Sequence, residues 1–136
     1  MSFVVDASVA GSWFLPDEAM ASTMALARRM AQEGAAAPNL LWHEVRNLLL
    51  GAFRRGRLIA ADLEAQLDAL EALPIRDAGR GEAPLVARLC VGRRLTSYDA
   101  AYLAVALADA IPLASLDREL RSAARAEGVA LLPKTI

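Results

Sequence analysis

The sequence has few of the side chains from which many binding sites are built. Its 136 residues include one cysteine, Cys90, and one histidine, His43, and aromatic residues make up only 5%. A single cysteine cannot form an intramolecular disulfide, and one cysteine with one histidine cannot form a zinc cage of His and Cys ligands. We therefore expect a protein of the reducing cytoplasm whose site uses other residue types.

Long apolar runs and a basic leader are also absent. Hydrophobic residues make up 56% of the chain, yet no segment approaches the roughly 18 uninterrupted apolar residues of a membrane-spanning helix. No basic residue precedes the first apolar run, and Asp6 interrupts it, so we predict neither a signal peptide nor a membrane partner. The length predicts a single domain, residues 1–136, and the apolar surplus predicts a subunit or partner interface.

Lysine is nearly absent as well, because all but one of the 15 basic residues are arginines, and the net charge is −1. Arginine suits bidentate phosphate contacts, although any one cluster can equally be a solvated helix face. Arg118 and Arg121, one turn from Asp117, are our candidates for holding a phosphodiester strand. The other clusters are Arg28 with Arg29, Arg54, Arg55 and Arg57 together, and Arg93 with Arg94.

The hydrophobic pattern alternates between short strands and helices. Strands are predicted at residues 3–5, 112–115 and 129–132, with a weaker one at 74–77 and either a strand or a loop at 35–38. Helices are predicted at residues 8–15, 17–32, 39–56, 60–73, 82–94 and 117–126, and another begins at 95–99 and continues through Leu107. This alternation predicts an α/β fold, a parallel sheet with helices on both faces.

Four acidic residues stand out by their positions. Asp6 and Asp117 directly follow apolar strands, and ligands of open α/β sheets bind at the carboxyl ends of strands. Glu44 and Asp99 lie beside strongly apolar helix faces, which would pack against that sheet. Each acid also has a structural explanation: the three aspartates can cap helices, and Glu44 can reach solvent. Together, however, the four positions predict a cluster of carboxylates.

Such a cluster needs a cation. Gathered carboxylates repel one another, and burial raises their pKa values, unless a positive ion neutralises them. Oxygen ligands without histidine favour Mg²⁺, or alternatively Mn²⁺, over zinc. A divalent ion of this kind can activate a water for in-line attack on a phosphate.

The chain resembles the PIN domain family, and within it the VapC-type toxins of bacterial toxin–antitoxin pairs. The resemblance covers essentially the whole chain and rests on VVDAS at 4–8, WHEVRN at 42–47, TSYDAAYLAVA at 96–106 and LASLD at 113–117. It implies a three-layer αβα fold with a central parallel sheet, and metal-dependent endoribonuclease activity on RNA such as tRNA or rRNA. It also implies a homodimer and a small cognate VapB-like antitoxin that covers the active site.

The resemblance also assigns roles to residues. The catalytic acidic quartet that holds Mg²⁺ corresponds to Asp6, Glu44, Asp99 and Asp117. Asp6 and Asp99 look like its first ligands, and Glu44 and Asp117 look like ligands that act directly or through metal-bound water. Three polar residues match supporting positions of the family, namely Ser8, Asn47 and Ser115, the last standing where threonine is frequent.

Two alternatives stay open on the residues alone. Receiver domains and haloacid-dehalogenase-like phosphatases also place an aspartate after the first strand. The phosphatases need a second aspartate two residues on, where this chain has Ser8, and both classes need a lysine, for which only Lys134 is present. The second alternative is a catalytically silent PIN-like domain that binds RNA or acts as a scaffold.

Overall fold

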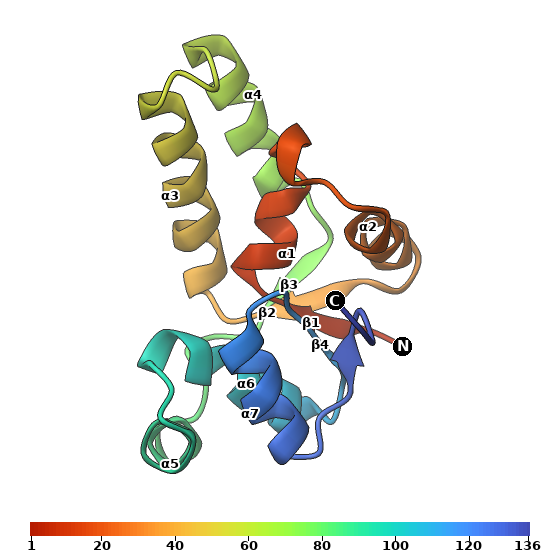
Figure 1. Cartoon of the computed structure of the whole chain (residues 1–136), viewed down its shortest axis with the longest axis vertical. Helices are drawn as coiled ribbons and strands as arrows, with labels where there is room; N and C mark the ends of the chain where they lie inside the picture. Colours follow the sequence, from red (N-terminus) through yellow and green to blue (C-terminus); the bar gives the residue numbers. More distant parts are fainter.

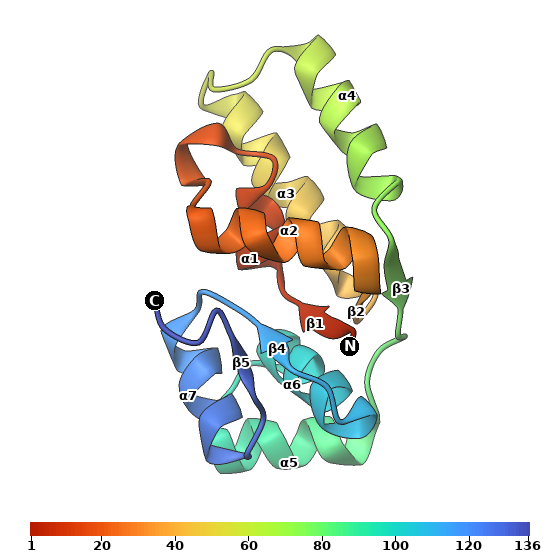
Figure 2. The ribbon, with the colours of Figure 1, turned by 90° about the vertical axis from the view of Figure 1, so that its right-hand side faces the viewer.

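The computed structural model describes residues 1–136 and shows one central sheet between two layers of helices (Figures 1 and 2). All neighbouring strands pair in parallel, in the order β3-β2-β1-β4-β5. The strands are β1 (Phe3–Val5), β2 (Ala35–Ala37), β3 (Ile75–Asp77), β4 (Leu113–Ala114) and β5 (Leu131–Leu132). The predicted αβα fold with a parallel sheet is confirmed, and the segment left open between strand and loop is β2.

The helices divide between the two faces of this sheet, as Figure 2 shows. On one side lie α1 (Ala7–Ser12), α2 (Ala21–Glu33), α3 (Leu40–Arg54) and α4 (Ala60–Glu71). On the other lie α5 (Ala83–Arg93), α6 (Ser97–Asp109) and α7 (Arg118–Ala126). None of these helices is long and apolar enough to cross a bilayer.

The middle of the sheet is covered on both faces. Every residue of β1 is fully buried, which explains why Phe3–Val5 is a continuous apolar run rather than an alternating one. The three alanines of β2 are poor strand formers, but pairing with β1 and β3 and burial override that preference. The site described below lies at the carboxyl end of this buried centre.

Helices α1 and α3 pack closely together beside β1. A Cβ atom added to Gly11 of α1 would lie 2.8 Å from Cδ1 of Leu48 on α3, which is the end of an exposed, flexible side chain that can move aside. The packing of the two helices brings Glu44 on α3 to the same cavity as Asp6, which precedes α1.

The structure corrects the predicted start of α2. Asp17 and Glu18 do not open this helix but lie in a short 3-10 turn, Pro16–Glu18, and α2 begins at Ala21. The Thr23 hydroxyl accepts a hydrogen bond from the Met20 amide at 3.2 Å and so satisfies a donor at the helix start. Asp17 instead forms an ion pair with Arg57. The two residues are far apart in the sequence, so no local sequence pattern predicts this contact.

Candidate active site

The four acidic residues lie together in one cavity. Asp6 follows β1 and Asp117 follows β4, two neighbouring parallel strands, so both carboxylates emerge at the same edge of the sheet. Glu44 on α3 and Asp99 on α6 approach from the two helical layers. The cavity measures about 330 Å³ and is lined by Asp6, Ala7, Ser8, Glu44, Asn47, Leu48, Asp99, Tyr102 and Asp117.

Asp6 is the most buried of these acids, with 4% of its surface exposed. It caps α1, since the Val9 amide donates to Oδ1 at 3.1 Å, and the Ser8 hydroxyl donates to the same oxygen at 2.6 Å. Burial raises the pKa of Asp6 to about 6 and outweighs the hydrogen bonds from Ser115, Ser8 and Val9, which lower it. The nearby charge of Asp117 raises this pKa further.

Two serines fix the position of Asp117 relative to Asp6. The Leu116 amide donates to Ser8 Oγ at 2.9 Å, and the Asp117 amide donates to Ser115 Oγ at 3.0 Å. Asp117 also caps α7, because its Oδ1 accepts from the Leu120 amide at 2.8 Å. Both aspartates therefore cap helices, as their positions in the sequence allowed. Each cap uses only Oδ1 of the carboxylate, so the second oxygen takes no part in capping.

Asp99 is half-buried and its carboxylate accepts no hydrogen bond. Thr96 caps α6 by accepting from the Asp99 amide at 3.1 Å, but the carboxylate does not return a bond to the Thr96 backbone. Only half of the expected capping box is present. Burial, followed by the charges of Asp117 and Glu44, raises the pKa of Asp99, so this acid is surrounded by like charge.

Tyr102 is a site residue that the sequence did not single out. Its hydroxyl donates to Glu44 Oε1 at 2.6 Å and so orients that carboxylate. Burial, then the hydrogen bond to Glu44, raises the pKa of Tyr102, which keeps the hydroxyl protonated as a donor. The available signal was spacing, since Tyr102 lies three residues after Asp99 and faces the same side of α6.

The structure corrects the prediction for Arg121. This side chain is only 3% exposed. Its guanidinium donates to four backbone carbonyls, those of Ser115 at 2.9 Å, Leu132 at 3.4 Å, Pro133 at 2.8 Å and Lys134 at 3.2 Å. A group engaged in this way cannot hold an RNA strand. Arg118 is exposed and has no ion pair, so the prediction for that residue stands.

The cavity suits a hard divalent cation by its chemistry, although it is not a ready-made ligand shell. Nowhere do three His, Cys, Asp or Glu side chains converge closely enough to form a metal-ligand group. However, the donors are all oxygens, and the raised pKa values of Asp6 and Asp99 show that burial and neighbouring charge disfavour their ionised forms. A cation would relieve this cost.

Because Asp6 has a pKa of about 6, divalent-cation binding should weaken in mild acid. A proton on Asp6 competes with the ion, so affinity should be constant above that pKa and fall by about tenfold for each pH unit below it. Calorimetric titration of Mg²⁺ from about pH 5 to about pH 8 measures this. Asp6→Asn removes the titrating group and is the control: its weaker affinity should change less with pH. A wild-type affinity that does not fall below pH 6 would contradict the prediction.

Comparison with known proteins agrees with this architecture. No curated protein gives a significant match. Among solved structures, the chain is similar to the crystal structure of PAE2754 from Pyrobaculum aerophilum, with a TM-score of 0.71 and 26% identity over 90% of this chain and 84% of that chain. Residues 3–126 match the PIN domain, a nuclease-type fold whose members generally hydrolyse nucleic acids and typically use divalent metal ions. This match spans the strands and helices that carry all four acids, and on it the chain belongs to the PIN domain family.

Proposed function

We propose that this PIN domain is a Mg²⁺-dependent endoribonuclease that hydrolyses phosphodiesters of tRNA or rRNA, with Mn²⁺ as the alternative ion. The proposal rests on one observation. A single cavity at the carboxyl ends of β1 and β4 is lined by all four acids, Asp6, Glu44, Asp99 and Asp117. Asp6 and Asp99 are the first ligands in this proposal. Glu44 and Asp117 complete the site directly or through water.

The chain's own residues prepare this site in distinct ways. Ser8 and the Val9 amide hold Asp6, and Tyr102 holds Glu44, so both carboxylates are oriented before any ligand arrives. A bound divalent ion would supply Lewis-acid chemistry, which lowers the pKa of a water and offsets charge on the phosphate. In the proposed reaction, the water oxygen bonds to phosphorus and one P–O bond of the RNA strand breaks. A neighbouring carboxylate accepts the proton of the attacking water, and the leaving oxygen takes a proton from solvent.

We further infer that the protein is a VapC-type toxin that pairs with a small VapB-like antitoxin and forms a homodimer within that assembly. Apolar side chains exposed beside the cavity support an inhibitor at this place: Leu48 is 42% exposed and Met20 43%. A second hollow of about 520 Å³ includes both and shares Ser8 and Leu48 with the acidic cavity. An antitoxin segment bound there would cover the catalytic acids.

The test is cleavage of labelled tRNA and rRNA fragments by the purified chain with Mg²⁺, with Mn²⁺ and with a chelator. We expect internal cleavage with the ions, none with the chelator, and inhibition by the cognate antitoxin, which the proposal places in a small reading frame directly upstream. Binding of RNA without cleavage under every ion would favour the catalytically silent alternative. Cleavage that the upstream protein does not inhibit would support the nuclease and remove the toxin assignment.

A further inference from the structure

We propose that the groove between α5 and α7 is the path along which a single-stranded RNA backbone reaches the acidic cavity, with Arg94, Arg118 and Arg125 as its phosphate contacts. This rests on the proposed function, because it identifies how that site would hold its substrate. The groove measures about 450 Å³ and is lined by Gly92, Arg93, Arg94, Leu95, Glu119, Ser122, Ala123 and Ala126.

The groove begins next to the acidic cavity. Glu119, which lines the groove, is two residues after Asp117 of the cavity, in the first turn of α7. Arg118 directly follows Asp117 of the cavity, and Leu95 of the groove is four residues before Asp99. A strand lying in the groove would therefore arrive at the catalytic acids.

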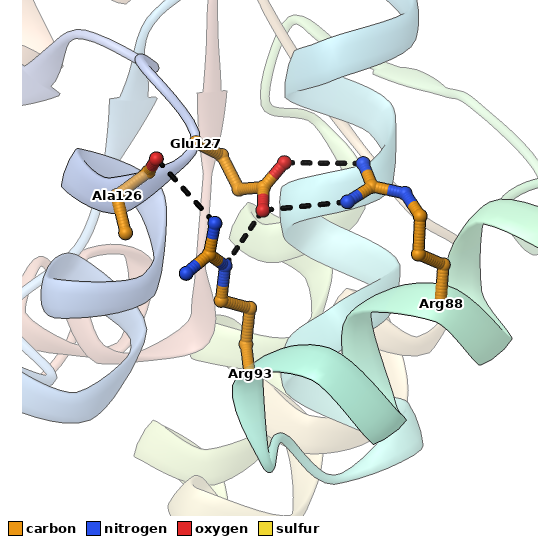
Figure 3. Close-up of polar contacts among 4 residues, drawn as sticks. All are labelled: Arg88, Arg93, Ala126 and Glu127. Atoms are coloured by element: carbon orange, nitrogen blue, oxygen red, sulfur yellow. Dashed lines mark hydrogen bonds and ion pairs between the residues drawn. The ribbon is translucent and has the colours of Figure 1, made fainter.

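The two walls of the groove are braced against each other, as Figure 3 shows. Glu127, which directly follows α7, accepts hydrogen bonds from Arg88 at 3.1 Å and Arg93 at 2.6 Å, both on α5. Arg93 also donates to the Ala126 carbonyl at 3.5 Å. These contacts fix the spacing of α5 and α7, so the groove exists before a ligand binds. They also engage Arg93, which leaves Arg94 as the unpaired arginine of this pair.

The three proposed contacts are exposed arginines with no ion pair and no side-chain hydrogen bond within the chain. Arg118 and Arg125 are seven residues apart on α7, and Ser122 lies between them on the same face. Arg94 stands across the groove in a left-handed conformation, φ 57°, which normally favours glycine. Arg118 and Arg125 directly precede the groove residues Glu119 and Ala126 on α7, so they border the groove rather than line it. Together with Arg94 they place three unpaired positive charges around the groove, against the single negative charge of Glu119 among its lining residues.

A nucleic acid fits this surface better than an acidic peptide. Tyr98 is 66% exposed and lies between Leu95 of the groove and Asp99 of the cavity in the sequence. An exposed aromatic ring beside a positively charged groove is the arrangement on which single-stranded bases stack. The ring would hold a base while the arginines hold the backbone.

The test measures how salt weakens RNA binding in the Asp99→Asn variant, in which the RNA should survive. Fluorescence anisotropy with a labelled single strand of about 16 nucleotides gives the affinity at each salt concentration. Arg94→Ala, Arg118→Ala and Arg125→Ala should each weaken binding and flatten the slope of log affinity against log salt by about 0.7. Arg28→Ala, an exposed arginine on α2 across the sheet, is the matched control and should change neither.

Two further variants separate RNA binding from folding. Arg94→Gly suits the left-handed backbone, so its melting temperature should equal or exceed that of the parent while RNA binding weakens as in Arg94→Ala. Ala110 is the other left-handed non-glycine residue, with φ 53°. The Ala110→Gly variant should also have a melting temperature equal to or above that of the parent, and it should bind RNA with normal affinity. Tyr98→Ala should lower RNA affinity about 5- to 150-fold without changing the salt slope.

Unchanged salt slopes in all three arginine variants would overturn the proposal. So would normal RNA binding combined with lost affinity for the antitoxin, since the groove would then be a protein-docking surface. If the arginine dependence holds but the wild-type chain cleaves no RNA with any ion, the RNA groove stands and the nuclease assignment falls.

Discussion

Replacing Asp99 with asparagine should lower the rate of RNA cleavage by about 10³-fold or more, because the proposed site would lose a metal ligand and with it several kcal/mol of transition-state stabilisation. Asp6→Asn should have a similar effect. Both changes keep the shape of the side chain, and the amide introduced by Asp6→Asn retains an oxygen that can accept from the Val9 amide and so cap α1. Cleavage rates and growth arrest on induced expression measure the effect.

The Asp99→Asn substitution should not weaken the fold. The Asp99 carboxylate accepts no hydrogen bond, and like charges from Asp117 and Glu44 surround it, so losing its charge should leave the metal-free chain equally or more stable. Asp109→Asn, an exposed position at the end of the same helix, is the matched control and should cleave normally. If the Asp99→Asn variant arrests growth as its parent does, the carboxylate cluster is not the active site.

Arg121→Ala should lower the free energy of unfolding by about 3 kcal/mol or more. Its guanidinium is buried and donates to the carbonyls of Ser115, Pro133 and Lys134, which would lose their partner. Removing one side of a buried hydrogen-bond network costs the desolvation of the groups left behind, in addition to the bonds themselves. Urea unfolding, with the slope checked for two-state behaviour, measures the change.

Two variants show where that energy comes from. Arg125→Ala, one turn further along α7 but exposed, should change stability by no more than about 0.5 kcal/mol. Arg121→Met keeps an unbranched apolar stem and removes only the donors. If Arg121→Met is as stable as the wild type, the backbone hydrogen bonds contribute nothing and packing of the stem explains the arginine.

The fold and the gathering of acids were predictable because their signals are local. The run Phe3–Val5 followed by Asp6 already specifies a buried strand with an acid at its carboxyl end, and residues 112–117 repeat the pattern. Parallel pairing then places both aspartates at one edge. Amphipathic spacing also placed Glu44 correctly, at the boundary between the buried and the exposed face of α3.

The remaining features depend on partners far away in the sequence. Arg118 and Arg121 are equivalent by helical spacing, and only the chain returning through Pro133 and Lys134 buries one and leaves the other free. Similarly, the Tyr102 hydroxyl donates a hydrogen bond to Glu44, which lies 58 positions earlier in the sequence, so composition and periodicity could not predict this contact. The roles of these residues in catalysis stay predictions for the variants above to test.

The hydrogen bond between Ser8 and the Leu116 amide also bears on the order of folding. It joins positions 108 residues apart, next to the pairing of β1 with β4, and such distant contacts form slowly because the chain must first close a long loop. Early helical hairpins such as α3 with α4 need no such closure. We therefore expect a partly folded chain to carry much of its helical structure while Asp6 and Asp117 are still apart, with the acidic cavity among the last features to be assembled.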